Sequence, residues 1–276
     1  VDYKNLGLVR NIYHGTPIAK ITPPTEGTPG TDIMGKPVAQ KHGVPAKFSV
    51  GKGTELVNDG TEIIASVDGN LVYTNGSFCI EESLLIRGDV DVSSGNIDFI
   101  GDIMVKGNVM EGFSVTSKKN VTIFGTVTNG TVTADGNITI KLGSINSKLR
   151  SEKGSIKLDF CQNSSVWAAC NVEASSFIGG DVYAGKKLIA SGKGILVGGK
   201  YTALEDISAS VIGSDNYAKT MITLGNNAVL SEEMEGHKHK VAELEDKLDQ
   251  LGKIVTTLTE MAKVSKLSPQ REQMKV

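Results

Sequence analysis

Histidine is the most common general base in enzymes, and its distribution limits the chemistry open to this chain. The four histidines are His14, His42, His237 and His239, so residues 43–236 contain none. Acyltransferases of the left-handed β-helix class generally take a histidine base from their coils, and this gap counts against them. His237 and His239 do not suit a helical metal site either, because residues two apart on a helix face different directions. We expect no metal site and no histidine-dependent catalysis.

A carboxylate-rich stretch is the second candidate for chemistry. It contains Asp89, Asp91, Asp98 and Asp102, which could form a calcium site or the acid/base pair of a polysaccharide-cleaving β-helix. The spacing does not match an EF-hand loop, and the Gly-Gly-x-Gly-x-Asp repeat of calcium-binding solenoids is missing. Alternate residues of a strand face solvent, where aspartate is well tolerated. The pattern therefore favours surface positions over a site.

A glycine- and lysine-rich stretch, residues 192–200, is the third candidate, since such stretches can bind phosphate. It lacks the Gly-Lys-[Ser/Thr] ending of a P-loop, and we expect turn glycines instead. Trp167 and Phe177 are isolated aromatics, which we expect in the core or at its ends rather than in a sugar-binding platform. We accordingly predict no catalytic residue and no cofactor, and we do not expect an enzyme.

Composition narrows the class of protein further. The chain has 276 residues, 32 glycines, 5% aromatic residues and a net charge of -2, which suggests many tight turns and no basic footprint for nucleic acid. Neither a membrane span nor a signal peptide is visible. Three cysteines without a CxxC pair, Cys79, Cys161 and Cys170, predict free thiols in the cytoplasm. Because residue 1 is valine, we expect the sequence to be a fragment.

Proline marks the first of three regions. Six of the seven prolines lie in the first 45 residues, and the next is Pro269. Residues 1–82 predict a β-rich domain, a small barrel or sandwich, with a loop over residues 22–30. Asp68-Gly69 and Asn75-Gly76 predict turns with positive φ on either side of a short strand.

A repeat of about 18 residues fills the second region, residues 83–226. A Gly-x-[Val/Ile] step recurs with spacings of 19, 18, 18 and 37, and Cys161 is expected to occupy the skipped glycine position; Gly199 adds a further turn, so the repeat glycines are Gly88, Gly107, Gly125, Gly143, Gly180 and Gly199. A second phase consists of apolar pairs with one residue between them: Ile103/Val105, Val121/Ile123, Ile138/Ile140 and Ile156/Leu158.

This period predicts a parallel β-helix of about seven coils, each with three short strands joined by tight turns. Val and Ile two residues apart point inward and fill the core, and the coils stack at about 4.8 Å. Asparagines near the turns, such as Asn120, Asn129 and Asn137, tolerate the left-handed conformation and could form side-chain ladders.

The third region, residues 227–276, predicts a helix with an a/d heptad seam. The seam consists of Val241, Leu244, Leu248, Leu251, Val255 and Leu258. Such a seam needs a partner helix, so we expect one arm of an antiparallel coiled-coil hairpin. Ser268-Pro269 resembles the start of the return helix. A homo-oligomer through the coiled coil is the alternative.

Several stretches together resemble the flagellar assembly protein A family. They are Val1-Asp2-Tyr3 and the residues 15–19, 27–35, 88–91, 95–101, 192–199, 203, 212–214 and 223–225, followed by the heptad-bearing helix. The resemblance implies a right-handed, single-stranded parallel β-helix with an N-terminal domain and a C-terminal helical extension. It implies a bacterial cytoplasmic protein, in some members placed at the cell pole, and it supplies no catalytic residues. Full-length members have a further N-terminal region and a return helix.

Three functional hypotheses follow. The first is a non-enzymatic scaffold or adaptor, whose rigid rod separates two protein-binding modules. The second is a bactofilin-like cytoskeletal polymer, formed by stacking of open solenoid ends, which are unpaired edges. The third is a β-helix acyltransferase or polysaccharide-active enzyme, which would require a histidine or carboxylate cleft.

Overall fold

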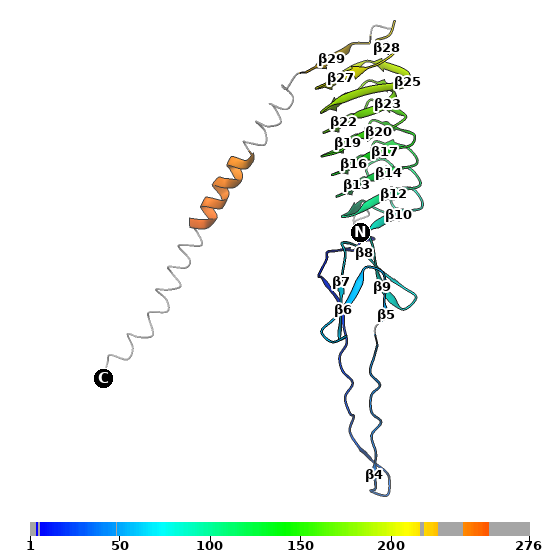
Figure 1. Cartoon of the computed structure of the whole chain (residues 1–276), viewed down its shortest axis with the longest axis vertical. Coiled ribbons are helices and arrows are strands. Elements are labelled where there is room, and N and C mark those ends of the chain that lie inside the picture. The colour runs from blue at the N-terminus through cyan, green and yellow to red at the C-terminus, as the bar shows by residue number, and fades with distance from the viewer. Residues whose placement is uncertain (1–3, 5, 48, 216–217, 226–239, 254–276) are drawn as a thin grey trace, which may run out of the picture. The chain divides into compact units, whose positions relative to one another are not determined.

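A computed structural model describes residues 4, 6–47, 49–215, 218–225 and 240–253 (Figure 1). The chain divides into two compact units, Val1–Gly225 and Asn226–Val276, which are described separately. The first unit is built from β-strands, and the described part of the second is helical. The expected mainly-β fold with a parallel solenoid is confirmed.

Three small sheets make up the N-terminal region. Their strand orders are β1-β8-β9-β5, β2-β7-β6 and β3-β4. The strands are β1 (Asn11–Ile12), β2 (Pro17–Lys20), β3 (Gly30–Thr31), β4 (Pro37–Val38), β5 (Ser49–Val50), β6 (Thr54–Val57), β7 (Glu62–Ala65), β8 (Gly69–Thr74) and β9 (Ser77–Glu81). Ile63, Ala65 and Ile80 are fully buried between them.

The two predicted turn dipeptides behave differently. Asn75 and Gly76 both have positive φ, at 52° and 79°, and close the β8–β9 hairpin as expected. Gly69 does not have positive φ and lies inside β8, so this turn prediction is wrong. Glycine is needed there for another reason: a Cβ would collide with the carbonyl of Glu81 on the neighbouring strand.

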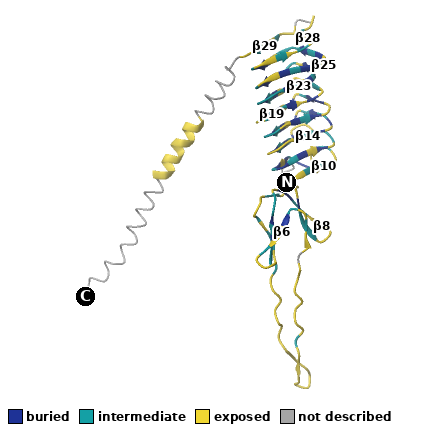
Figure 2. Cartoon of the chain, in the orientation of Figure 1, coloured by how far each residue is buried: buried dark blue, intermediate teal, exposed yellow. Residues whose placement is uncertain are grey.

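An exposed arm leaves the N-terminal sheets between β2 and β5. Residues 21–29 have no regular structure, which confirms the predicted loop except for Gly30, the first residue of β3; the arm ends in the two-residue strands β3 and β4. Almost every residue from 22 to 47 is exposed, as the yellow colour around this arm shows (Figure 2). The arm therefore owes little of its form to core packing.

The solenoid has three faces, and its first two are joined in one 12-stranded sheet because β23 and β25 run across both. The first face contains β10 (Ser83–Ile86), β12 (Asp102–Val105), β14 (Val121–Ile123), β17 (Ile138–Ile140), β20 (Ile156–Lys157), β23 (Val172–Ile178), β25 (Lys187–Val197) and β27 (Asp206–Ser208). The second continues through β15 (Val127–Thr128), β18 (Gly143–Ile145), β21 (Phe160–Gln162) and β28 (Val211–Ile212).

The third face is a separate eight-stranded parallel sheet. Its strands are β11 (Ile97–Phe99), β13 (Ser114–Ser117), β16 (Thr131–Ala134), β19 (Lys148–Ser151), β22 (Ser165–Ala168), β24 (Asp181–Ala184), β26 (Gly199–Ala203) and β29 (Thr220–Leu224). Eight strands on this face make eight turns, one more than predicted. The estimate of seven was too low because the last turn extends to Leu224 in β29, past Gly199, the last glycine of the predicted repeat.

The predicted apolar pairs form the core of the solenoid. Parallel registers place Ile103 beside Val121, and Val121 beside Ile138, at successive levels. The first member of each predicted pair is at most 2% exposed: Ile103, Val121, Ile138 and Ile156. The second members are Val105, Ile123, Ile140 and Leu158; the first three are at most 1% exposed, and Leu158 is 4% exposed. The period-two alternation predicted from the sequence is therefore the alternation of inside and outside.

The repeat glycines do not occupy one phase of the coil. The N–H of Gly107 donates to Gly88 O at 3.1 Å, and that of Gly125 donates to Gly107 O at 3.0 Å, so these three stack. Gly143 lies in β18 opposite Phe160, and Gly180 and Gly199 stack at another corner.

The expectation for Cys161 is therefore wrong. Its register partner is Ser144, and Phe160 is the residue opposite Gly143.

Side-chain ladders close the corners between faces. Asp102 Oδ1 accepts the backbone N–H of Asn120 at 3.1 Å, and Asn120 Oδ1 accepts that of Asn137 at 2.8 Å. The column continues through Ser155 and Asn171. Each side chain thus binds a backbone N–H one coil further along, which satisfies donors that the strands leave unpaired.

A second column consists of residues in the left-handed conformation. Asn129, Asn146 and Asn163 follow one another at a constant spacing, one in each coil, with φ of 50°, 50° and 48°. The same position one coil earlier and one coil later is Gly112 and Gly179, both with positive φ. Glycine adopts this conformation freely and asparagine more readily than most residues, which accounts for their presence in this column.

In the second unit, residues 240–253 form a helix. Val241, Leu244, Leu248 and Leu251 lie on it and are exposed. Val255 and Leu258, the other two predicted seam residues, are outside the described residues. The predicted coiled coil stays a prediction.

The left-handed column predicts a selective substitution effect. Asn146→Ala should lower the free energy of unfolding by about 1 kcal/mol, because alanine pays the steric cost of positive φ. Asn146→Gly should lower it less, since glycine accepts this conformation freely. Urea unfolding followed by circular dichroism measures both. Equal losses in the two variants would show that backbone conformation does not decide this position.

Candidate functional site

The four aspartates do not converge on a site. Asp89 Oδ1 accepts the backbone N–H of Asn108 at 2.6 Å. Asp102 Oδ1 belongs to the corner ladder with Asn120. Asp91 accepts from Ser93 through both its hydroxyl, at 2.6 Å, and its backbone N–H, at 2.8 Å. These bonds from Ser93 lower the pKa of Asp91.

Three of these carboxylates thus accept backbone N–H groups, and the fourth, Asp98, is exposed in the middle of β11. No group of three or more His, Cys, Asp or Glu residues that could hold a metal occurs within the described ranges. His14 and His42 are both exposed in the N-terminal region. His237 and His239 lie outside the described residues, so the structure says nothing of them.

The glycine-rich stretch lies mostly in strands β25 and β26, and its glycines bend the chain, as expected of turn glycines. Gly192 and Gly194 interrupt the long strand β25 with positive φ, and Gly198 and Gly199 form the next corner, also with positive φ. The following element is strand β26, whereas a phosphate loop leads into a helix.

Cys161 lies in the core and is 1% exposed. Ser144 Oγ lies 3.8 Å from its sulfur. Burial raises the pKa of the thiol to about 11, so the group is neutral at physiological pH. A buried, protonated thiol does not act as a nucleophile.

Phe177 and Trp167, the two isolated aromatic residues, lie in different environments. Phe177 is fully buried and packs edge-on against Tyr201, with ring centroids 6.0 Å apart, as the prediction of a core position requires. Trp167 faces outward, because its neighbours Val166 and Ala168 are the buried residues of β22. A core or cap position for Trp167 is therefore wrong.

Trp167 instead belongs to a column on the outer side of the third face. Its ring stacks on Tyr183 at 5.8 Å, and the Arg150 guanidinium lies 4.1 Å from its centroid on the other side. The three residues are register partners on adjacent strands. This column stabilises the face through stacking and a cation–π contact.

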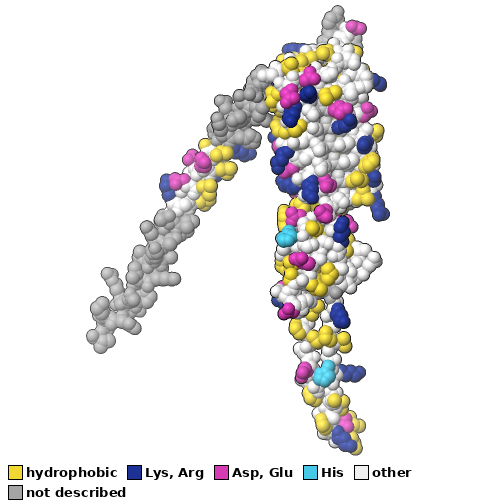
Figure 3. All heavy atoms as spheres, viewed as in Figure 1, with side chains coloured by type: hydrophobic (Ala, Val, Ile, Leu, Met, Phe, Trp, Pro, Cys, Tyr) yellow, Lys and Arg dark blue, Asp and Glu magenta, His cyan; other side chains and the backbone are white. Residues whose placement is uncertain are grey.

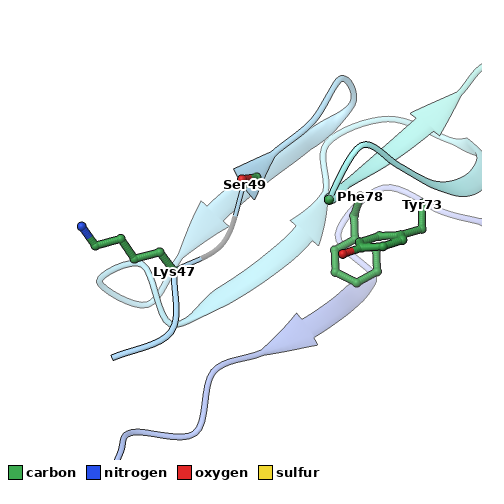
Figure 4. A pocket seen from close by; sticks show the side chains of 5 residues that line it. Lys47, Ser49, Tyr73 and Phe78 are labelled. Atoms are coloured by element: carbon green, nitrogen blue, oxygen red, sulfur yellow. The ribbon is translucent and has the colours of Figure 1, made fainter. Parts of the chain in front are cut away.

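A hollow of about 390 Å³ lies beside the β8–β9 hairpin, lined by Lys47, Ser49, Tyr73, Gly76 and Phe78. The Tyr73 and Phe78 rings pack against each other at 5.0 Å. The Lys47 side chain points away from both rings (Figure 4). Ligand sites normally combine apolar walls with converging polar groups, and this hollow lacks that convergence.

The two ends of the solenoid differ. At the first coil, Asn96 N–H donates to Lys4 O at 2.7 Å, and Ile100 N–H donates to Asn11 Oδ1 at 3.3 Å. Val9 packs against the core there. The last coil, in contrast, leaves a group of large apolar residues exposed: Val211, Ile212, Met221, Ile222 and Leu224. Three surfaces thus stand out as candidates for binding: this last coil, the helix face at residues 241–251, and the arm.

Comparison with protein families gives two matches, which together cover nearly the whole chain. Residues 82–275 match the Flagellar Assembly Protein A beta solenoid domain, and residues 1–76 match the Flagellar Assembly Protein A N-terminal region. No curated protein and no solved structure matches the chain. Within the described residues, no helix has the length and apolar character required to cross a membrane.

The raised pKa of Cys161 predicts a pH dependence of stability. The thiol titrates near 9 when unfolded and near 11 when folded, so the unfolded chain loses this proton first as pH rises. The group therefore leaves stability unchanged below pH 9 and lowers it between pH 9 and 11, by up to about 3 kcal/mol.

Urea unfolding at a series of pH values tests this prediction. Cys161→Ala should flatten the loss of stability above pH 9, and the control Cys170→Ala, at a half-buried position, should not. If the Cys161→Ala protein loses stability with pH as steeply as the unmodified chain, the prediction fails.

Proposed function

Because the chain belongs to the flagellar assembly protein A family, we propose that it is a non-enzymatic bacterial scaffold or adaptor in flagellar assembly or in polar placement of the flagellum. The observation that supports this role most is the use of the solenoid's polar residues. The aspartates and asparagines at its corners bind backbone N–H groups of neighbouring coils. Their side-chain oxygens therefore contribute hydrogen bonds that connect one coil to the next.

A rigid spacer is the mechanical part of this proposal. Eight turns at about 4.8 Å per step give a rod of about 35 Å. Parallel hydrogen bonds between every pair of adjacent coils make such a rod stiff. It would hold whatever binds at its N-terminal domain at a fixed distance from its last coil.

The helix supplies the second interaction module in this proposal. Val241, Leu244, Leu248 and Leu251 repeat with gaps of 3, 4 and 3, and all four are exposed. Lys247 pairs with Glu243 and Lys253 with Asp249, both one turn apart and off the apolar seam. Apolar residues at a and d with charges elsewhere favour a coiled coil, either with a return helix or with a second copy.

The compartment that fits is the bacterial cytoplasm, with recruitment to the cell pole. The three cysteines are free, as expected for proteins kept in a reducing environment. Partners are other proteins, which we expect to engage the N-terminal domain, the coiled coil, or both.

Genetic replacement in the source bacterium tests the role. Deleting the gene should change the number or position of flagella, counted by electron microscopy, and reduce swimming. Leu244→Glu/Leu248→Glu should reproduce the deletion, because charges at a and d positions prevent helix pairing. The matched control Ala242→Glu/Gln250→Glu adds the same charges off the seam and should restore swimming.

Two results would contradict the scaffold. One is a deletion strain with normal flagella and normal swimming. The other is a substitution on the solenoid surface that abolishes a measured turnover while the circular dichroism spectrum stays unchanged.

A bactofilin-like polymer is the second candidate, and the exposed apolar residues of the last coil favour it. A polymer of stacked solenoids requires two open ends. Lys4 and Asn11 bond to the first coil, so end-to-end stacking there is blocked, and pairs rather than filaments are favoured. Negative-stain electron microscopy distinguishes the two: long filaments would support the polymer, and uniform particles the scaffold.

A further inference from the structure

The tip of the arm exposes two large apolar side chains to water. Ile33 and Met34 lie between β3 and β4 and are 103% and 78% exposed. Val38 and Val44, further along the same arm, are also exposed. Figure 3 shows hydrophobic side chains gathered around the end of the arm, next to basic ones. An isolated apolar residue at a surface is ordinary, but an adjacent pair at the end of an extended arm suggests a binding role.

The turn that carries this pair is held in a defined shape. Asp32 Oδ1 accepts the backbone N–H groups of Met34 at 2.9 Å and Lys36 at 2.8 Å. Asp32 N–H donates to Lys36 O at 2.9 Å, and Gly35 N–H donates to Asp32 O at 3.0 Å. These four hydrogen bonds fix the backbone of the turn, while the side chains of Ile33 and Met34 take no part in them and project outward.

The charge of the arm adds a second observation. Residues 21–47 contain Lys36, Lys41 and Lys47, together with His42, against the two acids Glu26 and Asp32. The Asp32 carboxylate already accepts two backbone N–H groups. The arm therefore presents an apolar tip together with three lysines against two acids, a small net positive charge.

We propose that the tip of this arm inserts into the interface of an anionic lipid bilayer, with Ile33 and Met34 entering the acyl boundary and the lysines contacting acidic headgroups. Apolar residues backed by basic ones are the pattern by which proteins lie on membranes without spanning them.

A lipid surface fits this tip better than a protein partner does. A specific protein interface needs about 800 Å² from each partner, and two side chains at the end of a narrow turn offer much less. Insertion into a bilayer needs only a few apolar side chains and favourable charge. Because a single shallow anchor binds reversibly, the expected association is weak and salt-dependent.

Vesicle flotation with the full chain tests the proposal. The chain should float with vesicles of two parts phosphatidylcholine to one part anionic phosphatidylglycerol and remain unbound with pure phosphatidylcholine. Ile33→Ser/Met34→Ser should lower the partition coefficient on anionic vesicles by about tenfold or more, because most of the apolar contact is lost. Lys36→Gln/Lys41→Gln should lower it severalfold, as should higher salt.

A matched control comes from the first face of the solenoid. Leu85→Ser/Met104→Ser removes a second exposed apolar pair, on the adjacent strands β10 and β12, and should leave vesicle binding unchanged. Amide hydrogen exchange adds an independent readout: residues 30–38 should exchange more slowly on anionic vesicles, and residues 83–86 at the same rate.

Two results would overturn the proposal. Equal flotation of the Ile33→Ser/Met34→Ser chain and the unmodified chain would place membrane binding elsewhere. No flotation with anionic vesicles would exclude a lipid surface as the partner of the tip and would point to a pocket on another protein instead. The four substituted residues of the arm are all exposed, so the serine variant and the glutamine variant should both fold. Circular dichroism checks this.

Discussion

Hydrogen bonding between the backbones of successive coils is the interaction on which the rest of this structure depends. Every neighbouring pair of strands in the solenoid is parallel, so each coil is both the support and the template of the next. Residues 46–268 contain no proline, which leaves every backbone N–H of this stretch available as a donor. The apolar core follows from the same stacking, because one coil alone cannot bury its inner face.

This constraint explains why carboxylate and amide side chains of the described solenoid bind backbone N–H groups instead of converging on one another. Corners leave N–H groups that strands cannot satisfy, and short side chains with an oxygen acceptor fill that need. Asp89 and Asp102 are used in this way, as is Asn120. A carboxylate-rich stretch in a β-solenoid is therefore weak evidence for catalysis, since the fold itself selects such residues.

Much of this architecture could be predicted because it repeats. The period and the buried pairs, such as Val121 and Ile123, are visible in the sequence, and the registers confirm them. The prediction that the repeat glycines share one position in the coil was wrong, because several corners require glycine for different reasons. Glycines at different positions therefore looked like one repeat. The core position predicted for Trp167 was wrong because the prediction relied on its large apolar side chain. Side chains alternate along β22, and Trp167 lies on the outward-facing side. The coil count was low because the last turn extends to β29, past Gly199, the last glycine of the predicted repeat.

The loop in the arm was predicted, but the shape of its tip could not be, for the opposite reason. Its conformation depends on local hydrogen bonds around Asp32 and on two very short strands, which leave no periodic signal. Regularity also limits what the rod can recognise, because successive coils present similar backbone and similar spacing on each face. Distinct recognition requires a departure from the repeat. Among the described residues, such departures are the arm, the last coil and the helix, which is why the proposed binding surfaces are placed there and the solenoid is proposed as the spacer.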